Sequence, residues 1–483
     1  MYDIYFYKKN IEYPSPEHFF NPQSIYPEYP WSQDHCSEKN DVYEAVREAL
    51  GGIGLDSGNF KTPEWNPLGD IITPGNTVLV KPNWVSHKNN NPEAGLDCLV
   101  THTSIVRAVL DYCIIALKGS GKIILGDAPI QGADLAMLLS LNHVDEVLEN
   151  YRNKGVDIEL CDFRMSQACG KNGVWHKRVK VNDAEAAIGV NLGVNSEFYE
   201  IETTHKKYHV MDYSYTKTKQ YHRSGKHIYS INKVVLDADV IINLPKPKCH
   251  KLAGMTGALK NMVGIVADKA CLPHESLGPK TAGGDSYPYN NLFKAASVSI
   301  RELKTTYEEK GHYVPALIAR YVDSGFRLLT RVFSGNHYEF GSWHGNDTIW
   351  RTILDLNTIV QFADKNGVLQ NTVQRKQFHL ADMIISGENE GPLAPSSKKL
   401  GVIVAGFNAI LVDRLIVRIM GFDEQKIPSI HQALKRTHHN KDNETINLGS
   451  NEPRCSAKNI DEIEFPNEMM FKPHSGWKGF IEK

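Results

Sequence analysis

A short basic loop carries the side chains of this chain that are best suited to anion binding and proton transfer. It lies within the sequence DADVIINLPKPKCHKLAGMTGALKNMVGIV, where an apolar strand at Val240–Leu244 leads into Lys246, Lys248 and His250. Lysine holds anions by its charge, and histidine exchanges protons near neutral pH. A solvated basic loop is the alternative interpretation. Two prolines stiffen the loop and its flanks are apolar, which favours a fixed position and therefore a site.

Two further predicted strands end in polar clusters of the same kind. Val78–Val80 is followed by Lys81 and Asn83, and Lys122–Leu125 is followed by Asp127. The carboxyl ends of parallel strands lie at one edge of a sheet, where ligands bind, so the three clusters should meet there. Helices that start at this edge also offer free N–H groups to an anion. The sequence therefore predicts one site built from all three strand ends.

These clusters suggest chemical roles for their side chains. His250 is the candidate general acid/base, and its lysine neighbours should keep the imidazole neutral near pH 7. Asp127 would orient His250 or bind a metal ion, while Lys81, Lys246 and Lys248 would hold the anion. Such a set suits reactions at carboxylates, phosphates or enolates, and no single motif selects among them.

Metal binding and covalent catalysis stay open as alternatives. His102, Asp127, His250 and His274 offer nitrogen and oxygen donors, but none of their spacings is typical of a metal site, so we assign no metal ligands. A divalent metal as cofactor stays open. Cys249 lies beside basic residues that can lower a thiol pKa, although a buried, inert cysteine is the favoured interpretation. The glycines after the basic loop match neither the dinucleotide fingerprint nor the P-loop, so no standard nucleotide motif is predicted.

Composition excludes several classes of protein. The chain has 483 residues, with 54 basic and 56 acidic side chains and a net charge of -2, which gives no general attraction to nucleic acid. Its 8 cysteines form no Cys-x-x-Cys pair, so no iron–sulfur cluster or zinc ribbon is predicted. No apolar run is long enough to span a bilayer, and no signal segment is recognisable. We expect a cytoplasmic protein with a small anionic partner; a homo-oligomer stays open.

The order of predicted elements indicates an α/β fold. Strands alternate with helices such as Ser104–Leu117, which predicts a mostly parallel sheet with helices on both faces. Two regions interrupt the alternation, one β-rich and one helical. We expect an extended N-terminal arm (1–40), the first part of the α/β core (41–162), a β-rich insertion (163–231), the central core with the Lys-x-Lys-x-His loop (232–274), a helical insertion (275–373), the last part of the core (374–437) and a C-terminal tail (438–483).

Several motifs occur together in a fixed order. VLVKPNWV, THTSIVRAVL, KIILGDAP, the basic stretch above and SGENEGPLAPSSKKLGVIVAGFNAILVDRLIVRIMGF follow one another across Val78–Gly421. In this order the chain resembles the family called domain of unknown function 362. The resemblance marks individual residues as important positions, Gly391 and Pro392 among them, and does not imply a reaction. Of the marked positions we assign catalytic roles to His250, Asp127, Lys248 and Lys260, and substrate binding to Lys81, Asn83, His102, Lys246, Asn261, Glu388 and Asp413.

The resemblance implies a pathway more than a reaction. Many relatives carry a ferredoxin-like module with Cys-x-x-Cys repeats, which this chain lacks, so an iron–sulfur role is not implied. The GNDTIWRTILDLN and FKPHSGWKGFIE segments are similar to a longer branch found with capsule or O-antigen assembly enzymes. A looser similarity joins the TGALKN region to nickel-pincer lactate racemases.

The leading hypothesis from the sequence is a cytosolic enzyme. Its substrate would be a phosphorylated or nucleotide-linked sugar, or a carboxylic acid, in surface-polysaccharide synthesis. One alternative is a non-catalytic module that binds glycan precursors or partner enzymes. Another is a redox or racemase-like enzyme with a bound cofactor.

Overall fold

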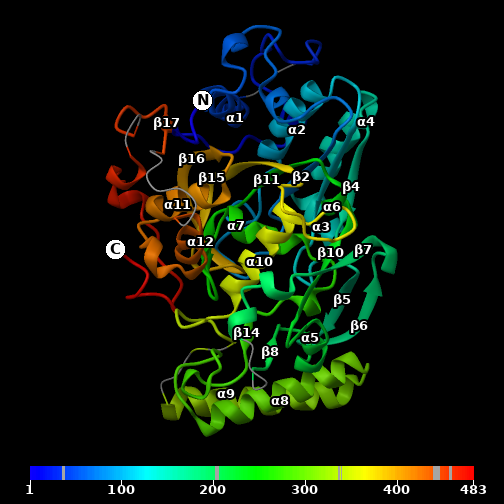
Figure 1. The fold of residues 1–483 in the computed structure, drawn as a ribbon, viewed down its shortest axis with the longest axis vertical. Helices are drawn as coiled ribbons and strands as arrows, with labels where there is room; N and C mark the ends of the chain where they lie inside the picture. Colours follow the sequence, from blue (N-terminus) through cyan, green and yellow to red (C-terminus); the bar gives the residue numbers. More distant parts are fainter. Residues whose placement is uncertain (35–38, 202–205, 335–337, 339, 439–445, 456–458) are drawn as a thin grey trace.

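The structure is a computed structural model that describes residues 1–34, 39–201, 206–334, 338, 340–438, 446–455 and 459–483. Within these residues the centre is a ten-stranded sheet in the order β17, β1, β16, β15, β11, β2, β3, β4, with β12 and β13 attached beside β15 (Figure 1). Its strands are β1 (Ile4–Lys8), β2 (Thr77–Pro82), β3 (Lys122–Asp127), β4 (Ile158–Asp162), β11 (Val240–Leu244), β12 (Lys248–His250), β13 (Gly254–Thr256), β15 (Lys376–Glu390), β16 (Ala394–Gly406) and β17 (Leu448–Ser450).

One half of this sheet is parallel. The strands β11, β2, β3 and β4 are neighbours that run in the same direction. Val78 of β2 pairs with Val240 of β11 and with Ile123 of β3, so the three strands end at the same edge. The prediction that the polar clusters after these strands share one edge is confirmed. Their apolar runs are buried on both faces, as expected for parallel strands covered by helices.

Helices cover both faces of the sheet, and successive side chains of a strand point to opposite faces. Val78 and Val80 join the core beneath the first helices of the chain, whereas Leu79 points to the opposite core. The predicted α/β fold is therefore confirmed. The helices are α1 (Asp41–Gly52), α2 (Thr103–Leu117), α3 (Leu135–Leu141), α4 (Val144–Asn153), α5 (Tyr215–Tyr221), α6 (Lys233–Asp237), α7 (Ala258–Asn261), α8 (Leu292–Glu309), α9 (Tyr313–Ser334), α10 (Ile349–Phe362), α11 (Ala409–Ile419) and α12 (Pro428–His438).

The other half of the sheet is largely antiparallel and contains the N-terminal segment. The strand β1 lies between β16, to which it is antiparallel, and β17, to which it is parallel. The prediction that residues 1–40 form an extended arm is therefore wrong for Ile4–Lys8, because Ile4 and Phe6 are buried in the core. The predicted tail also contributes to this core, through β17 and the fully buried Trp477.

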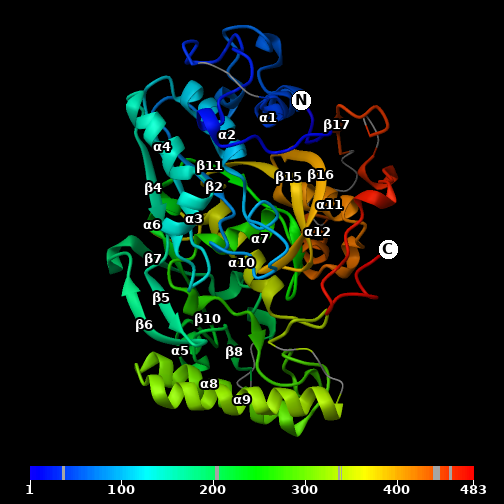
Figure 2. The ribbon, with the colours of Figure 1, turned by 180° about the vertical axis from the view of Figure 1, so that it is seen from behind.

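Smaller elements form the two regions that interrupt the alternation. Residues 163–231 hold β5 (Ser166–Lys171), β6 (Val174–Lys180), β7 (Ala187–Asn191), β8 (Tyr208–His209), β9 (His222–Arg223) and β10 (Lys226–Asn232). Residues 275–373 hold β14 (Glu275–Ser276), which pairs with β8, and the helices α8, α9 and α10. Figure 2 shows α8 and α9 as a hairpin along one end of the molecule, whereas α10 packs in the interior. Among the described helices, none is long and apolar enough to cross a membrane.

The position of β1 in the sheet predicts that the N-terminal segment stabilises the whole fold. Phe6 is 1% exposed and packs on Phe465, with ring centroids 5.3 Å apart. Phe6→Ala should lower the free energy of unfolding by about 3–5 kcal/mol, the usual result of removing a buried aromatic ring. Denaturant unfolding measures this change. Tyr2→Ala, at a side chain that is 37% exposed, is the control and should change stability much less. Equal losses in both variants would contradict the assignment.

Candidate active site

A cavity of about 210 Å³ lies beyond the shared edge of β2, β3 and β11. The predicted site residues that line it come from all three strand ends and from α7, at the centre of Figures 1 and 2. These residues are Asn83, Asp127, Lys248, His250, Lys260 and Asn261. The structure therefore brings these six together, and Pro392, which the resemblance also marks, lines the cavity with them. The other predicted binding residues do not line it; they are Lys81, His102, Lys246, Glu388 and Asp413.

Lys248 is held at the cavity by uncharged oxygens. Its Nζ donates to Asn83 Oδ1 at 2.5 Å and to the Lys246 carbonyl at 3.1 Å. Asn83 in turn donates to Asn261 Oδ1 at 2.8 Å, and Asn261 donates to Asn243 Oδ1 at 2.7 Å. Burial, together with the charges of Lys246 and Lys260, holds the pKa of Lys248 well below its usual value. An anion bound in the cavity would supply the missing negative charge and so stabilise the protonated form of Lys248.

Two further lysines, Lys260 and Lys269, line the same cavity. The Lys260 side chain makes no hydrogen bond or ion pair within the described part of the chain, and burial, aided by Lys269, lowers its pKa to about 7. Lys269 donates to the Ala128 carbonyl at 2.9 Å, and burial lowers its pKa to about 8. Both groups can therefore change protonation state near neutral pH, which suits proton transfer.

His250 is buried as a neutral ring whose proton position is fixed by the backbone. Its Nδ1 accepts hydrogen bonds from the N–H groups of Leu252 at 3.1 Å and Ala253 at 3.2 Å, so the proton lies on Nε2. Burial, followed by the charges of Lys260 and Lys251, holds its pKa well below the usual value. The predicted neutral imidazole agrees with this direction. A role as general acid/base does not fit this arrangement. Nδ1 already accepts two hydrogen bonds, and a neutral ring can donate a hydrogen bond from Nε2 but does not release that proton.

Asp127 is a structural partner of Lys81. Its Oδ1 accepts from Lys81 Nζ and from the Ala128 N–H, both at 2.8 Å, and its Oδ2 accepts from the Trp84 N–H at 2.6 Å. The prediction that Asp127 orients His250 is therefore not supported by the contacts. Lys81 is fully buried in this pair, so the prediction that it holds the substrate anion is also wrong.

Two other predicted binding residues lie in a separate buried cluster. Lys246 pairs with Asp382 at 3.0 Å and donates to the Tyr13 hydroxyl at 2.5 Å. The Tyr13 ring stacks on His102 with centroids 3.9 Å apart. Burial and the charge of Lys246 hold the pKa of His102 well below its usual value. Lys246 and His102 thus anchor the N-terminal segment instead of lining the cavity.

Asp413 occupies the helix start that was expected to bind an anion. Its carboxylate accepts from the N–H groups of Ala258 at 2.5 Å and Leu259 at 3.0 Å, at the N-terminus of α7. Burial raises the pKa of Asp413 to about 7, against the effect of these two hydrogen bonds. The expected free N–H groups are therefore already used by the protein. Glu388 accepts from the Lys472 N–H at 2.9 Å and also lies outside the cavity.

The alternatives from the sequence gain no support from the described contacts. Cys249 is fully buried, and burial raises its pKa, so it is not an activated nucleophile. Nowhere in the described ranges do three histidine, cysteine or acidic side chains gather as ligands of one metal ion would. His274 lines the cavity, but its Nδ1 lies 2.7 Å from the Leu272 carbonyl, to which it donates.

Sequence reasoning missed several residues that complete the cavity. Lys269 and Gln131 follow the strand ends at distances that no motif marks. Thr256 Oγ1 and Gln131 Oε1 are buried polar atoms without a hydrogen-bond partner among the described residues. Val210–Tyr213, from the β-rich region, forms another part of the wall. The mixed polar and aromatic composition of that region was the one available signal in the sequence.

Comparisons with known proteins identify the family of this chain. The family described as Domain of unknown function (DUF362) matches residues 78–194 and 184–418, so the chain belongs to this family. A thylakoid-associated protein from Synechocystis sp. is 24% identical over 202 residues, which are 42% of this chain and 43% of that protein. The chain thus matches less than half the length of this relative. A crystal structure of a Thermotoga maritima protein aligns with a TM-score of 0.31 and 10% identity, covering 81% of this chain and 59% of the other.

Gly264 makes the ion pair beneath the cavity possible. A Cβ atom at this position would lie 2.0 Å from Asp127 Oδ1 and 2.7 Å from Lys81 Nζ. Gly264→Ala should therefore break the pair and lower the free energy of unfolding by about 3–5 kcal/mol, measured by denaturant unfolding. Gly325→Ala in α9 is the matched control, since nothing lies within 4 Å of its added carbon. The control should be neutral or slightly stabilising, and a tolerated Gly264→Ala would refute the packing argument.

Proposed function

We propose that this protein is an enzyme that binds a small anionic substrate and transfers a proton to or from it. The observation that supports the proposal is the convergence of Lys248, Lys260 and Lys269 on one cavity. Two acidic residues line the same cavity, but Asp127 is paired with Lys81, and Asp212 accepts a hydrogen bond from Trp175 Nε1 at 2.8 Å. The three lysines therefore lack a counter-charge, in line with their lowered pKa values, and a phosphate or carboxylate is the group that best stabilises their protonated forms.

The remaining wall suits a compact substrate with an apolar part. The cavity is also lined by apolar side chains, namely Val85, Ile130, Leu252, Val263 and Leu393. The volume of about 210 Å³ is below the range of roughly 300–1,000 Å³ that is common for drug-sized ligands. The proposed substrate is therefore a phosphorylated sugar or a carboxylic acid, held by its anionic group at one end.

In this proposal each side chain at the cavity has its own role. Lys248 and Lys269 hold the anion, and Lys260 exchanges the proton because its pKa of about 7 suits transfer in either direction. His250 donates a hydrogen bond from Nε2 to oxygen that becomes negative during the reaction. Asn83 and Asn261 keep Lys248 in place. We place this reaction in the cytoplasm, in surface-polysaccharide synthesis as the motif resemblance implies.

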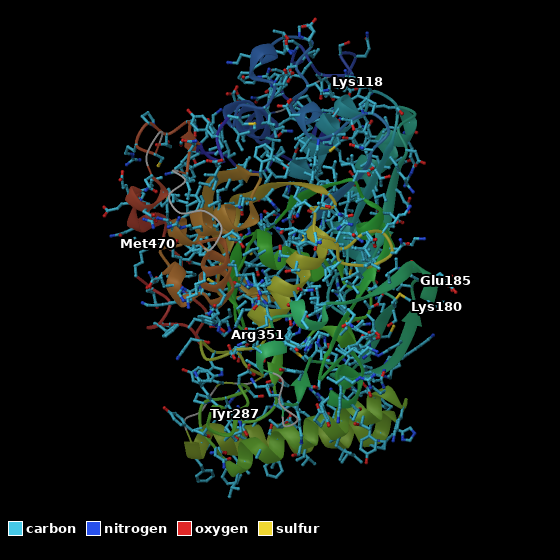
Figure 3. The ribbon with its side chains drawn as sticks, in the orientation of Figure 1. Lys118, Lys180, Glu185, Tyr287, Arg351 and Met470 are labelled. Carbon is cyan, nitrogen blue, oxygen red and sulfur yellow. The ribbon has the colours of Figure 1, made fainter. Side chains whose placement is uncertain are left out.

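Removing the charge of Lys260 tests its assigned role. Lys260→Met keeps the length of the side chain, and it should lower turnover by about 100-fold or more, as for loss of a general acid/base. The assay is turnover of phosphorylated and carboxylated metabolites. The matched control is Lys118→Met, at an exposed lysine labelled in Figure 3 that follows α2 and precedes β3. Full turnover by Lys260→Met would exclude Lys260 as the proton carrier.

The pKa values of the lysines predict how anion affinity depends on pH. Lys260 and Lys269 gain protons as pH falls through about 7 and about 8, and a bound anion favours the protonated forms. Affinity for sulfate should therefore decrease as pH rises through this range, and binding within it should take up protons. Calorimetry in buffers of different ionisation enthalpy measures both quantities. Sulfate is suitable because its own charge stays constant, and a pH-independent affinity would contradict the proposed binding mode.

A further inference from the structure

The helix α9 carries a continuous apolar stripe on its exposed side. The members of this stripe share one face of the helix, since most of them lie three or four residues apart and Gly325 occupies the same face between Tyr321 and Leu328. They are Val314 (63% exposed), Ile318 (60%), Tyr321 (61%), Val322 (44%), Leu328 (62%) and Val332 (67%). Leu292 and Leu303 add exposed apolar side chains on the neighbouring helix α8. A patch of this extent on a protein surface usually marks an interaction site.

The stripe faces away from the rest of the molecule. Ala316, Ala319, Asp323 and Thr330 lie on the opposite face of α9 and are buried. Figures 1 and 2 both show α8 and α9 side by side along one end of the molecule, with their outer side directed away from the sheet. Nothing in the described part of the chain therefore covers this face. With 22 residues, α9 presents it over a length of about 33 Å.

The exposed charged side chains of the α8–α9 hairpin are basic. Within 292–333 the acidic residues are Glu302, Glu308, Glu309 and Asp323, and each has partners inside the molecule. Arg331 in the last turn of α9 and Lys310 between the two helices are exposed. The hairpin thus combines exposed apolar side chains with two exposed cations, and its described residues include no exposed carboxylate.

This combination favours one kind of partner. Identical copies of the face would bring like charges together without a carboxylate to pair with them, which disfavours a self-contact. An anionic lipid surface supplies both the negative charge and the apolar interior that the stripe requires. We propose that the α8–α9 hairpin docks on the surface of an anionic bilayer, with α9 lying flat in the interface. The charged side of α9 then stays among the lipid headgroups.

Binding to vesicles of defined composition tests this proposal. The full chain should sediment with phosphatidylcholine vesicles that contain phosphatidylglycerol, and much less with phosphatidylcholine alone. Val332→Glu should weaken binding by about tenfold, because it replaces a side chain that would be buried in the interface by a charge. Val373→Glu is the matched control, since Val373 is 63% exposed and lies outside the hairpin. This control should bind as the unaltered protein does.

Two further measurements keep the test decisive if Val332→Glu alters the fold. Arg331→Gln should weaken binding to the anionic vesicles about fivefold, since one basic residue near such a surface contributes roughly this factor. Circular dichroism and the thermal midpoint establish that each variant is folded. Absence of vesicle binding by the unaltered chain would overturn the proposal. Vesicle binding that neither substitution weakens would also overturn it. The same holds if the chain forms a concentration-dependent dimer that Val332→Glu abolishes and does not bind vesicles.

Discussion

The buried ion pair between Lys81 and Asp127 joins the ends of β2 and β3, and the geometry of the candidate active site depends on it. Placing two charges in a protein interior costs hydration energy, and the pair is stable because further donors satisfy the carboxylate. The N–H groups of Trp84 and Ala128 are those donors. Gly264 leaves the space that the pair needs and accepts a hydrogen bond from Ala128. Two strand ends and the turn after α7 are thereby fixed around one charge pair.

Lysines that occur in similar sequence motifs have different roles in the structure, because their contact partners differ. Lys81 and Lys246 each contact a buried carboxylate and hold parts of the chain together. Lys260 contacts no carboxylate among the described residues, is half-buried and lines the cavity. The first arrangement stabilises the folded state and leaves the lysine unavailable to a ligand. The second leaves an amine without a counter-charge and with a pKa lowered to about 7, an arrangement that is common where a ligand supplies the opposite charge.

The sequence predicted the parallel half of the sheet because apolar runs such as Val240–Leu244 are bounded by clear turn residues. It did not predict β1, because an aromatic segment next to prolines resembles an arm when its partner strands are remote in sequence. Cavity residues after the strand ends were predictable from strand direction alone. The proton position on His250 was not, since it depends on two backbone N–H groups that only the folded loop brings to the ring. The role of Gly264 was equally hidden, because it follows from the position of Asp127.

The wall of the cavity is attached to the same hairpin that carries the apolar stripe. Ser214 directly follows Val210–Tyr213, and both its N–H and its hydroxyl donate to Glu309 of α8, each at 2.8 Å. The Tyr215 N–H donates to Glu302 of α8 at 3.0 Å. Hydrogen bonds to charged groups contribute about 1.5–3 kcal/mol each, so α8 and this wall should move together more readily than they separate. A hairpin held on a membrane would therefore also restrain the wall of the cavity, which couples the location of the protein to access by its substrate.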